Sequence, residues 1–490
     1  MGWWGRQRGV AAVETRARAP RNHHSLPPSP FQPIADALAN APDDASVAAQ
    51  AAALFAAAPA GALPPVVWIA HDTRPSSPAL AAATAAGVVA AGGVVVGAGV
   101  ATTPQLHWLV AAAARGEGAT PAAYFHALAS GHATLVAGTD PVNGEGTPLI
   151  VDCANGVGAA AVASLAPLVS AAGLSLTPVN IATDDPAALN AGAGSDHVQR
   201  TRTRPNNCAS IPPGALCASL DGDADRVLYW TPHGEGDGVT VFDGDRIAAL
   251  LARWAARVLL PAHPNPPDAS GPLTRGPVRT AYANGAAVEA AVAALGERGV
   301  PVARTGVKHL HAAATAFDVG VYYEANGHGA LLLGPRFKAA AAAAAAAGDA
   351  RAASLAAALA SASNQAVGDA LSGLLLVDAA LRGLGWSVAA WAGAYADLPS
   401  AHAAVRVADR AAIAVNSDES ATVAPAALVA AIEAAVASAG ARARAFARPS
   451  GTEDVVRVYA EAATREAADA LAAAVAGAVW EHGGGVGERP

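Results

Sequence analysis

A strand–loop–helix–strand pattern that occurs three times is the feature of the sequence that most constrains its fold. In the first copy, residues 66–70 form a short apolar run, Ser77 can cap the helix that follows, and residues 94–96 are again apolar. The same order of segments returns at residues 149–179 and at residues 278–303. Because strands that alternate with helices pack as a sheet covered by helices, we predict an α/β fold with three similar domains, each built on a βαβ-containing mixed sheet.

The end of the chain has a different order of segments, which predicts a smaller C-terminal α+β domain. Helices are expected at residues 426–439, where Gly440 ends the helix, and at residues 466–479. Strands are expected between them, at residues 444–446 and 455–460. An uninterrupted run of alanine precedes this region at residues 339–347, and we expect it to form part of a long exposed helix.

Composition excludes several classes of function. The 31 basic and 39 acidic residues give a net charge of −8, so we expect no nucleic-acid partner. The uncharged stretch at residues 78–106 is interrupted by Gly92-Gly93, unlike a membrane-spanning helix, so we expect no membrane partner either. The first 21 residues are rich in arginine without a following apolar core, which excludes a secretory signal and leaves a transit peptide, or a disordered or wrongly predicted start.

The cysteines favour a reducing compartment. There are three of them, with no Cys-x-x-Cys motif and no even set to pair: Cys153, Cys208 and Cys217. We therefore expect a cytoplasmic protein.

A group of three acidic side chains lies in a loop between two apolar segments. Asp221, Asp223 and Asp225 are spaced by two, and in extended chain this spacing directs side chains the same way. Converging carboxylates repel one another unless a cation lies among them, and hard oxygen ligands favour Mg²⁺ or Ca²⁺. An EF-hand is excluded because its sixth and twelfth positions would be Arg226 and Pro232. The alternative is a solvated acidic turn, and we favour the metal site.

A second polar loop lies between the two strands expected in the last domain. Its sequence is Arg-Pro-Ser-Gly-Thr-Glu, from Arg448 to Glu453, and Arg457 follows in the next strand. Hydroxyl groups, backbone N–H groups opened by a glycine, and two arginines can together bind an anion. The motif differs from a Walker A loop, which places Gly-Lys-Ser/Thr before a helix. Ser-Gly-Thr alone is an ordinary turn, but beside two arginines it is a candidate phosphate site.

A third polar stretch follows an apolar run in the third repeat. Glu324, Asn326 and His328 alternate, so they can point together into a cleft, where a carboxylate and an amide suit sugar hydroxyls. His328 can transfer a proton near neutral pH, although a single histidine is more often structural. The stretch at residues 305–311, which contains Lys308, is basic and begins with a glycine hinge.

Together these stretches resemble the α-D-phosphohexomutase superfamily, and within it most closely the phosphoacetylglucosamine mutase family. The resemblance runs from about Val66 to the C-terminus. Asn326 stands where hexose mutases tend to carry serine, which points to an N-acetylated sugar. Further motifs similar to those of the family occur at residues 72–77, 102–107, 151–156, 305–311 and 486–490.

The resemblance implies four domains around a central cleft and an isomerase, an intramolecular phosphotransferase. N-acetylglucosamine 6-phosphate and 1-phosphate would interconvert through a bisphosphate intermediate, on the route to UDP-N-acetylglucosamine, with a phosphoserine as donor. The implied metal ion is Mg²⁺, held by the three aspartates. Catalytic positions fall on Arg226, Lys308 and His328. The implied substrate-binding residues are Glu324, Asn326, Arg448, Ser450, Gly451, Thr452 and Arg457.

One departure from the family concerns the nucleophile. The Thr-Ala-Ser-His-Asn-Pro segment that carries the family's phosphoserine does not occur in the sequence, and Ser25 is a poor substitute for it. We therefore expect an N-terminally truncated or mis-started enzyme, with a non-catalytic sugar-phosphate-binding relative and a phosphoglucomutase or phosphomannomutase as alternatives. The expected division is an unmatched segment at residues 1–60, an incomplete first domain at 61–145, and further domains at 146–262, 263–394 and 395–490.

Overall fold

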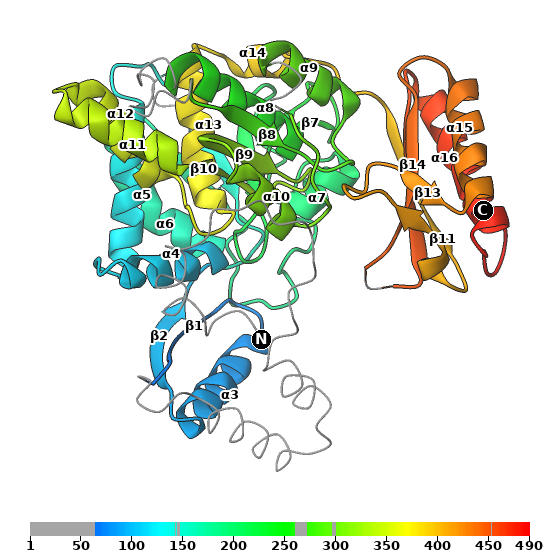
Figure 1. The fold of residues 1–490 in the computed structure, drawn as a ribbon. Helices are drawn as coiled ribbons and strands as arrows, with labels where there is room; N and C mark the ends of the chain where they lie inside the picture. The colour runs from blue at the N-terminus through cyan, green and yellow to red at the C-terminus, as the bar shows by residue number, and fades with distance from the viewer. Residues whose placement is uncertain (1–63, 143, 145–147, 260–271, 296–299, 452) are drawn as a thin grey trace, which may run out of the picture. The chain divides into compact units, whose positions relative to one another are not determined.

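The computed structural model describes residues 64–142, 144, 148–259, 272–295, 300–451 and 453–490 (Figure 1). The expected N-terminal segment at residues 1–60 lies outside this range. The chain divides into two compact units at Ala101, and each unit is described by itself.

The first unit contains the expected βαβ pattern. Strand β1 (Val66–His71) and strand β2 (Val94–Val100) pair in parallel, and helix α3 (Ser77–Ala90) connects them. The prediction that Ser77 caps the helix is wrong by one residue. Ser76 occupies the cap position, and the hydroxyl of Ser77 donates a hydrogen bond to the carboxylate of Asp72, so this side chain orders the loop before the helix.

Little apolar surface is buried within residues 64–101, the described part of this unit. No residue of α3 is buried, and Leu80 and Val89 are 62% and 63% exposed. Val66 and Val94, which are neighbours in the parallel strand pair, are also nearly half exposed. Since most helical stability in proteins comes from packing of an apolar face, β1, α3 and β2 have few contacts among the described residues that oppose local opening.

The second unit contains a mixed five-stranded sheet in which the chain doubles back after the third strand. Strands β4, β3 and β5 are parallel, while β6 and β7 continue the sheet as antiparallel neighbours. In spatial order the strands are β4 (Leu176–Val179), β3 (Leu149–Asp152), β5 (Cys217–Leu220), β6 (Val227–Pro232) and β7 (Val239–Phe242). The elements before and around this sheet are α4 (Thr103–Ala114), α5 (Pro121–Leu135), α6 (Gly158–Val169), η1 (Ser170–Ala172) and α7 (Ser195–Thr201).

A three-stranded sheet follows, in which β9 (Val319–Tyr323) lies between β10 (Gly329–Leu333) and β8 (Arg275–Val278). The prediction of strands up to residue 282 and over residues 300–303 is wrong. Strand β8 ends at Val278, and residues 300–303 contribute a single bridge, between Val302 and Arg279. The chain turns after the bridge because the N–H of Ala283 donates to the carbonyl of Thr280. The helices around this sheet are α8 (Gly244–Trp254), η2 (Ala255–Leu259), α9 (Gly285–Leu295) and α10 (Val307–Ala314).

The alanine run does not form a long exposed helix. Helix α11 (Pro335–Ala346) has twelve residues, and Phe337, Ala340 and Ala344 on one face of it are buried. It packs beside α12 (Ala350–Ala362), whose Ala352, Ala356 and Leu359 are also buried. Alanine favours a helix whether or not the helix is exposed, so the run by itself could not reveal the buried face.

Helix α13 (Ala370–Leu384) lies at the centre of the core of the second unit. All its residues from Ala370 to Arg382 are buried, and one apolar cluster joins it to α5, α6, β6, α8, β9 and α12. The short helix α14 (Val388–Ala392) adds Trp391 to this cluster. None of the helices in the described part of the chain is long and apolar enough to span a membrane.

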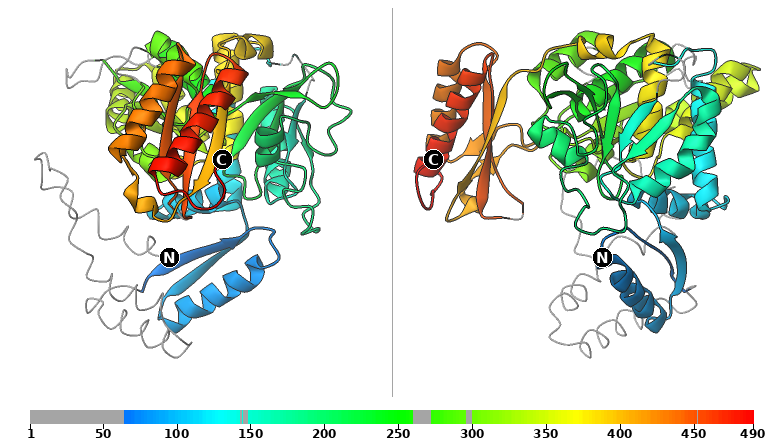
Figure 2. Two further views of the ribbon diagram at one scale, coloured as in Figure 1. Left: turned by 90° about the vertical axis from the view of Figure 1, so that its right-hand side faces the viewer. Right: turned by 180° about the vertical axis from the view of Figure 1, so that it is seen from behind.

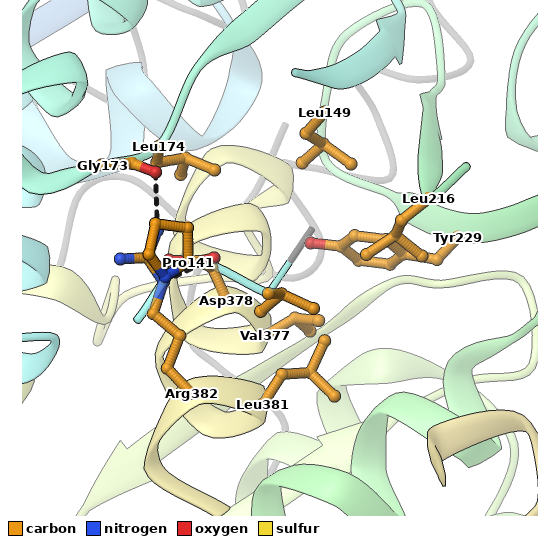
Figure 3. A pocket seen from close by; sticks show the side chains of 11 residues that line it. Pro141, Leu149, Gly173, Leu174, Leu216, Tyr229, Val377, Asp378, Leu381 and Arg382 are labelled. Atoms are coloured by element: carbon orange, nitrogen blue, oxygen red, sulfur yellow. Dashed lines mark hydrogen bonds and ion pairs between the residues drawn. The ribbon is translucent and has the colours of Figure 1, made fainter. Parts of the chain in front are cut away.

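A buried ion network fixes α13 to its neighbours. Asp378 lies between Nε2 of His132 at 2.7 Å and the guanidinium of Arg382 at 2.9 Å. Arg382 also donates to the carbonyls of Ala172 and Gly173. The cavity beside this network has a volume of about 20 Å³, enough for one water molecule and far too small for a sugar phosphate (Figure 3).

The C-terminal domain has the predicted α+β order with longer strands. Strand β15 (Val455–Glu461) lies between β11 (Ser400–Arg406) and β14 (Arg444–Pro449), and both pairs are antiparallel. Helices α15 (Ala426–Ala439) and α16 (Arg465–His482) lie side by side on one face of this sheet (Figure 2, left). The remaining short elements are η5 (Arg410–Ala412), β12 (Ala414–Val415) and β13 (Thr422–Ala424).

We expect the first unit to open more readily than the core of the second. In hydrogen–deuterium exchange at neutral pH, amides of β1 and β2 should exchange at least about tenfold faster than those of β5 and β6, because so little apolar surface opposes opening. The amides of β11 and β15 serve as the comparison for a sheet that is covered on one face by helices. Equal protection of β1–β2 and β5–β6 would contradict this expectation.

Candidate active site

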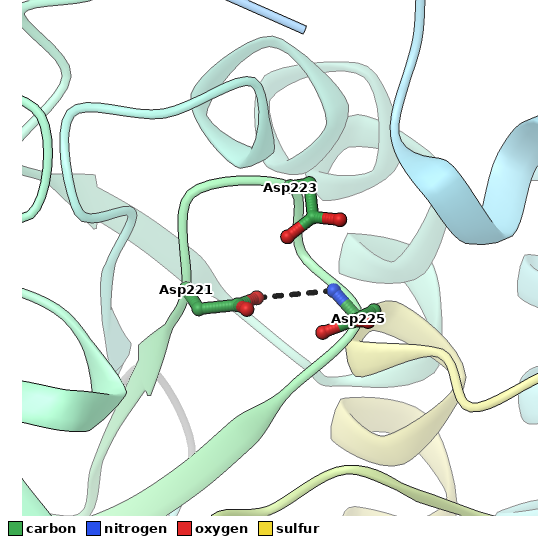
Figure 4. A group of neighbouring side chains, drawn as sticks. All are labelled: Asp221, Asp223 and Asp225. Atoms are coloured by element: carbon green, nitrogen blue, oxygen red, sulfur yellow. Dashed lines mark hydrogen bonds between the residues drawn. The ribbon is translucent and has the colours of Figure 1, made fainter. Parts of the chain in front are cut away.

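The three aspartates converge at the tight turn that connects β5 to β6 (Figure 4). Oxygen atoms of Asp221, Asp223 and Asp225 all lie within 4.8 Å of one another. The sequence analysis predicted this grouping correctly, but it assumed that the three aspartates lie in extended chain, and they lie in a turn. Ala224 has a left-handed φ of +57°, and Oδ1 of Asp221 accepts the N–H group of Asp225 at 3.1 Å. The turn folds back on its own first carboxylate and so brings the three side chains together.

Backbone N–H groups from three helix starts hold the acidic turn in place. Each donates to a carbonyl of the turn, so helix donors that lack an intrahelical partner are satisfied there. The positive ends of the helix dipoles also favour the negative charge of the turn. The three bonds are Thr103 N–H to Asp223 O at 3.3 Å from α4, Val157 N–H to Gly222 O at 3.1 Å from α6, and Ala370 N–H to Ala224 O at 3.2 Å from α13.

The approach of α6 to the turn requires glycine. A Cβ atom at Gly156 would lie 2.4 Å from the carbonyl oxygen of Gly222, closer than packed atoms come. The turn therefore depends on a glycine 66 positions away in the sequence.

The charges of the turn suit a divalent cation. Burial, and after it the neighbouring carboxylates of Asp225 and Asp223, raise the pKa of Asp221 to about 8. The hydroxyl of Thr103 donates to Oδ2 of Asp223 at 2.7 Å and so orients that side chain. Three crowded carboxylates, one of which burial holds in its protonated form, fit a hard cation bound through oxygen.

The sugar-loop candidate touches the acidic turn directly. Nδ1 of His328 lies 3.0 Å from Oδ2 of Asp225, and the backbones of Arg226 and His328 form a β-bridge. Burial raises the pKa of Asp225, but the hydrogen bond and charge of His328, together with Asp221 and Arg226, outweigh burial and leave the pKa below its ordinary value. Nε2 of His328 is buried and has no hydrogen-bond partner within the described residues. One ring nitrogen of His328 is thus committed to the acidic turn.

The three alternating residues lie in a turn and not in extended chain. Residues 324–328 form a tight turn between β9 and β10, in which the amide of Asn326 approaches Oε2 of Glu324 at 3.5 Å. The Oδ1 atom of Asn326 accepts the N–H group of His328. Gly327 has a φ of +88°, and a Cβ there would lie 2.2 Å from the carbonyl oxygen of Val227. The turn thus pairs Glu324 with Asn326 and directs His328 elsewhere, to Asp225.

Of the other two residues predicted to be catalytic, one lies at the acidic turn. Nε of Arg226 lies 3.6 Å from both Asp221 and Asp225, and its Nη1 lies 3.5 Å from Asp196. Lys308 is exposed on α10 and makes no hydrogen bond or ion pair within the part of the chain that the structure describes.

The two arginines of the phosphate-loop candidate are directly opposite each other. Arg448 on β14 pairs with Arg457 on β15 across the sheet, so both side chains lie on the same face. Like charges in this position are unfavourable, and each arginine has a carboxylate neighbour, Glu419 for Arg448 and Glu453 for Arg457. The buried Ser450 starts the connecting loop, Gly451 is exposed with open space around it, and Thr452 lies outside the described residues.

Two polar residues near these sites were missed by the sequence analysis. Thr103 bonds to Asp223 from 120 positions away, and its motif had drawn attention only as part of the family resemblance. Glu419 contacts Arg448, Arg304 and Thr305, but in the sequence it stands in the polar run Asn-Ser-Asp-Glu-Ser, which reads as a surface turn. Only the tertiary contacts distinguish either residue.

Family models match three parts of the sequence. Residues 243–386 match phosphoacetylglucosamine mutase AMG1, domain III. Residues 403–478 match the C-terminal domain of phosphoglucomutase/phosphomannomutase, and residues 38–127 match its alpha/beta/alpha domain I.

Curated relatives and solved structures agree with these matches. The phosphoacetylglucosamine mutase of Arabidopsis thaliana is 40% identical over 84% of this chain and 75% of its own length. The human enzyme is 38% identical over 86% of this chain and 77% of its own length. The Aspergillus fumigatus N-acetylphosphoglucosamine mutase, in complex with GlcNAc-6P and magnesium, superimposes with a TM-score of 0.80 at 36% identity, covering 92% of this chain and 88% of that one. An N-acetylglucosamine-phosphate mutase in its substrate complex gives a TM-score of 0.80 at 32% identity, covering 91% and 83%.

Binding of a divalent cation at the acidic turn should depend on pH. A cation must displace the proton that burial retains on Asp221, so Mg²⁺ affinity should increase from about pH 6 to about pH 8, by up to about tenfold per unit, and then level off. Calorimetry in two buffers of different ionisation enthalpy measures both the affinity and the proton released.

The variant Asp223→Ala supplies the internal comparison. It removes one ligand and one of the charges that raise the pKa of Asp221, so the affinity should fall and its pH dependence should move to lower pH. Asp237→Ala, an exposed acid in the connection between β6 and β7, should leave both unchanged. A wild-type affinity that is constant from about pH 6 to 8 would contradict the expected proton displacement.

Proposed function

Because the chain belongs to the phosphoacetylglucosamine mutase family, we propose that its site is built to interconvert N-acetylglucosamine 6-phosphate and N-acetylglucosamine 1-phosphate. The observation that supports this most is the contact between His328 and Asp225, which joins the sugar-loop candidate to the acidic turn in one site. The relatives of known structure include complexes with GlcNAc-6P and with glucose 1,6-bisphosphate. We propose the corresponding bisphosphate as the intermediate here, and synthesis of UDP-N-acetylglucosamine in the cytoplasm as the route that this reaction serves.

The chain's own residues divide into three groups by role. Asp221, Asp223 and Asp225 would hold Mg²⁺, which when bound offsets negative charge on the transferring phosphoryl group. Glu324 and Asn326 hold sugar hydroxyls, and their mutual contact keeps both side chains oriented before the sugar binds. The non-reacting phosphate is bound by Arg448, Arg457, Ser450, the N–H of Gly451 and Thr452.

Three further residues are proposed to act at the reacting groups. His328 keeps Asp225 ionised and oriented through its Nδ1 atom, and its second ring nitrogen is free of hydrogen bonds within the described residues. Arg226 is proposed to counter charge at the reacting phosphate, and Lys308 to approach the substrate from α10.

The four-domain division with boundaries near residues 145, 262 and 394 is proposed from the same resemblance to the phosphohexomutases.

The nucleophile sets the limit on turnover. A mutase of this type needs a side chain that accepts a phosphoryl group between half-reactions, because metal and positioning alone supply no acceptor. The sequence contains no Thr-Ala-Ser-His-Asn-Pro segment, which favours a second possibility for this chain, namely binding of sugar phosphate without efficient turnover.

We expect the site to prefer the N-acetylated sugar. N-acetylglucosamine 6-phosphate should bind at least about tenfold more tightly than glucose 6-phosphate, since the acetamido group adds both apolar contact and hydrogen bonds. Calorimetry with the two ligands measures this ratio, and Asn326→Ser should reduce it. Equal affinities in the unaltered protein would favour a phosphoglucomutase or phosphomannomutase instead.

The second expectation concerns catalysis. With Mg²⁺, N-acetylglucosamine 6-phosphate and a bisphosphate primer, the protein should yield little or no 1-phosphate, as followed by phosphorus NMR, although it binds the substrate. The variant Ser25→Ala identifies the acceptor if product does form. Full activity that Ser25→Ala abolishes would overturn the expectation and identify Ser25 as the phosphoserine.

A further inference from the structure

Glu419 connects the phosphate-loop candidate to the loop before α10. Its Oε2 atom accepts the N–H group of Thr305 at 3.2 Å and lies 3.4 Å from Nε of Arg448. Its Oε1 atom accepts a hydrogen bond from Nε of Arg304 at 3.2 Å. The residue is only 7% exposed, so this carboxylate is surrounded by the groups that it binds. Burial alone would raise the pKa of Glu419, but Arg448 and the N–H of Thr305 hold it below its ordinary value.

The turn that carries Glu419 holds it in an uncommon conformation. Glu419 has a left-handed φ of +62°, which residues other than glycine adopt at a cost of about 1–3 kcal/mol unless their surroundings fix them. In this turn, hydrogen bonds among residues 416–421 fix the conformation. Asn416 accepts the N–H groups of Glu419 and Ala421, and Asp418 accepts both the N–H and the hydroxyl of Ser420. These four hydrogen bonds fix the turn and so hold Glu419 in its left-handed conformation.

Arg448 lies at one end of a row of cross-strand pairs between β14 and β15, and its place in this row indicates the role of its contact with Glu419. Arg448 forms the last of three cross-strand pairs on the face of the sheet opposite α15 and α16. In the first pair, Arg444 binds Glu461 and donates to the carbonyls of Ala281 and Ala283. In the second, Phe446 and Tyr459 pack on the ring of Tyr282. These two pairs attach the C-terminal sheet to the loop before α9. In the third pair each arginine has a carboxylate neighbour, Glu419 for the half-buried Arg448 and the exposed Glu453 for Arg457.

Glu419 engages Arg448 on one edge only. The ion pair uses Nε, and the guanidinium lies 5.9 Å from the ring centre of Tyr282, within range of a cation–π contact. The guanidinium of Arg448 makes no hydrogen bond within the described residues, and its contact with Glu419 is an ion pair at Nε. A guanidinium has five donors in a rigid fork, so fixing its Nε edge orients the two terminal nitrogens for a bidentate anion.

We propose that Glu419 is a positioning residue for the substrate phosphate. It orients Arg448 through Nε and, through the N–H of Thr305, ties the phosphate loop to the loop before α10, so that the arginine fork is set before the ligand arrives. This inference rests on the proposed role of Arg448 in binding the phosphate of a sugar phosphate.

The test compares Glu419→Gln with the unaltered protein by calorimetry. Glutamine keeps the side-chain length and an acceptor for the N–H of Thr305, but it loses the charge that orients Arg448. Affinity for N-acetylglucosamine 6-phosphate should fall about tenfold or more, as for loss of a charged contact. Affinity for unphosphorylated N-acetylglucosamine should not change. Glu433→Gln, the same substitution at an exposed position of α15, should affect neither ligand.

A double-mutant cycle separates positioning from a general effect on the fold. If Glu419 acts through Arg448, adding Glu419→Gln to Arg448→Ala should cause little further loss of phosphate affinity. Should Glu419→Gln not fold, Glu419→Asp replaces it, because the shorter side chain keeps the charge but withdraws it from Nε. Unchanged or tighter binding by Glu419→Gln, or equal loss for the sugar and the sugar phosphate, would overturn the inference.

Inorganic phosphate as a second ligand keeps this test distinct from that of the proposed function. If the unaltered protein binds inorganic phosphate but not the sugar phosphate, the proposed function fails while the comparison at Glu419 can still be made. If it binds neither, both proposals fail together.

Discussion

The site depends on the satisfaction of three backbone donors by one acidic turn. The first turns of α4, α6 and α13 each have N–H groups that no helical carbonyl can accept, and the carbonyls of residues 222–224 accept one from each. The same arrangement places three helix dipoles toward three carboxylates, which lowers the cost of crowding negative charge. Because α13 is the most buried helix of the second unit, the acidic turn is fixed to the core and not to a mobile surface loop.

The C-terminal domain is organised by the two faces of one small sheet. Along each strand, alternate side chains such as Val456 and Val458 pack under α15 and α16. The side chains between them point to the opposite face and form the pairs that contact the loop before α9. The alternation along β14 and β15 therefore assigns core packing to one face and ligand chemistry to the other. The arginine pair belongs to the second face, and Glu419 sits where that face meets Thr305.

Several features could be predicted from the sequence because their causes are local. The helix at Ala426–Ala439 ends at a glycine with positive φ, and the hairpin from β5 to β6 follows from two apolar runs around a polar turn. The grouping of Asp221, Asp223 and Asp225 was also predicted, although through extended-chain geometry that the turn does not have. Predictions failed where neighbouring segments decide the outcome. Residues 279–283 turn instead of continuing β8, and the carbonyls of Ala281 and Ala283 accept hydrogen bonds from Arg444, 163 and 161 positions away.

The sequence by itself determined the α/β class, the order of the elements and the residue types of each polar loop, since these depend on periodicity, glycine and short-range spacing. Tertiary structure alone decided which loops meet. His328 contacts Asp225 across 103 positions of sequence, Thr103 contacts Asp223 across 120, and Glu419 contacts Arg448 across 29. Such contacts depend on how helices and sheets pack, and a polar side chain carries no local mark of the partner that packing brings to it.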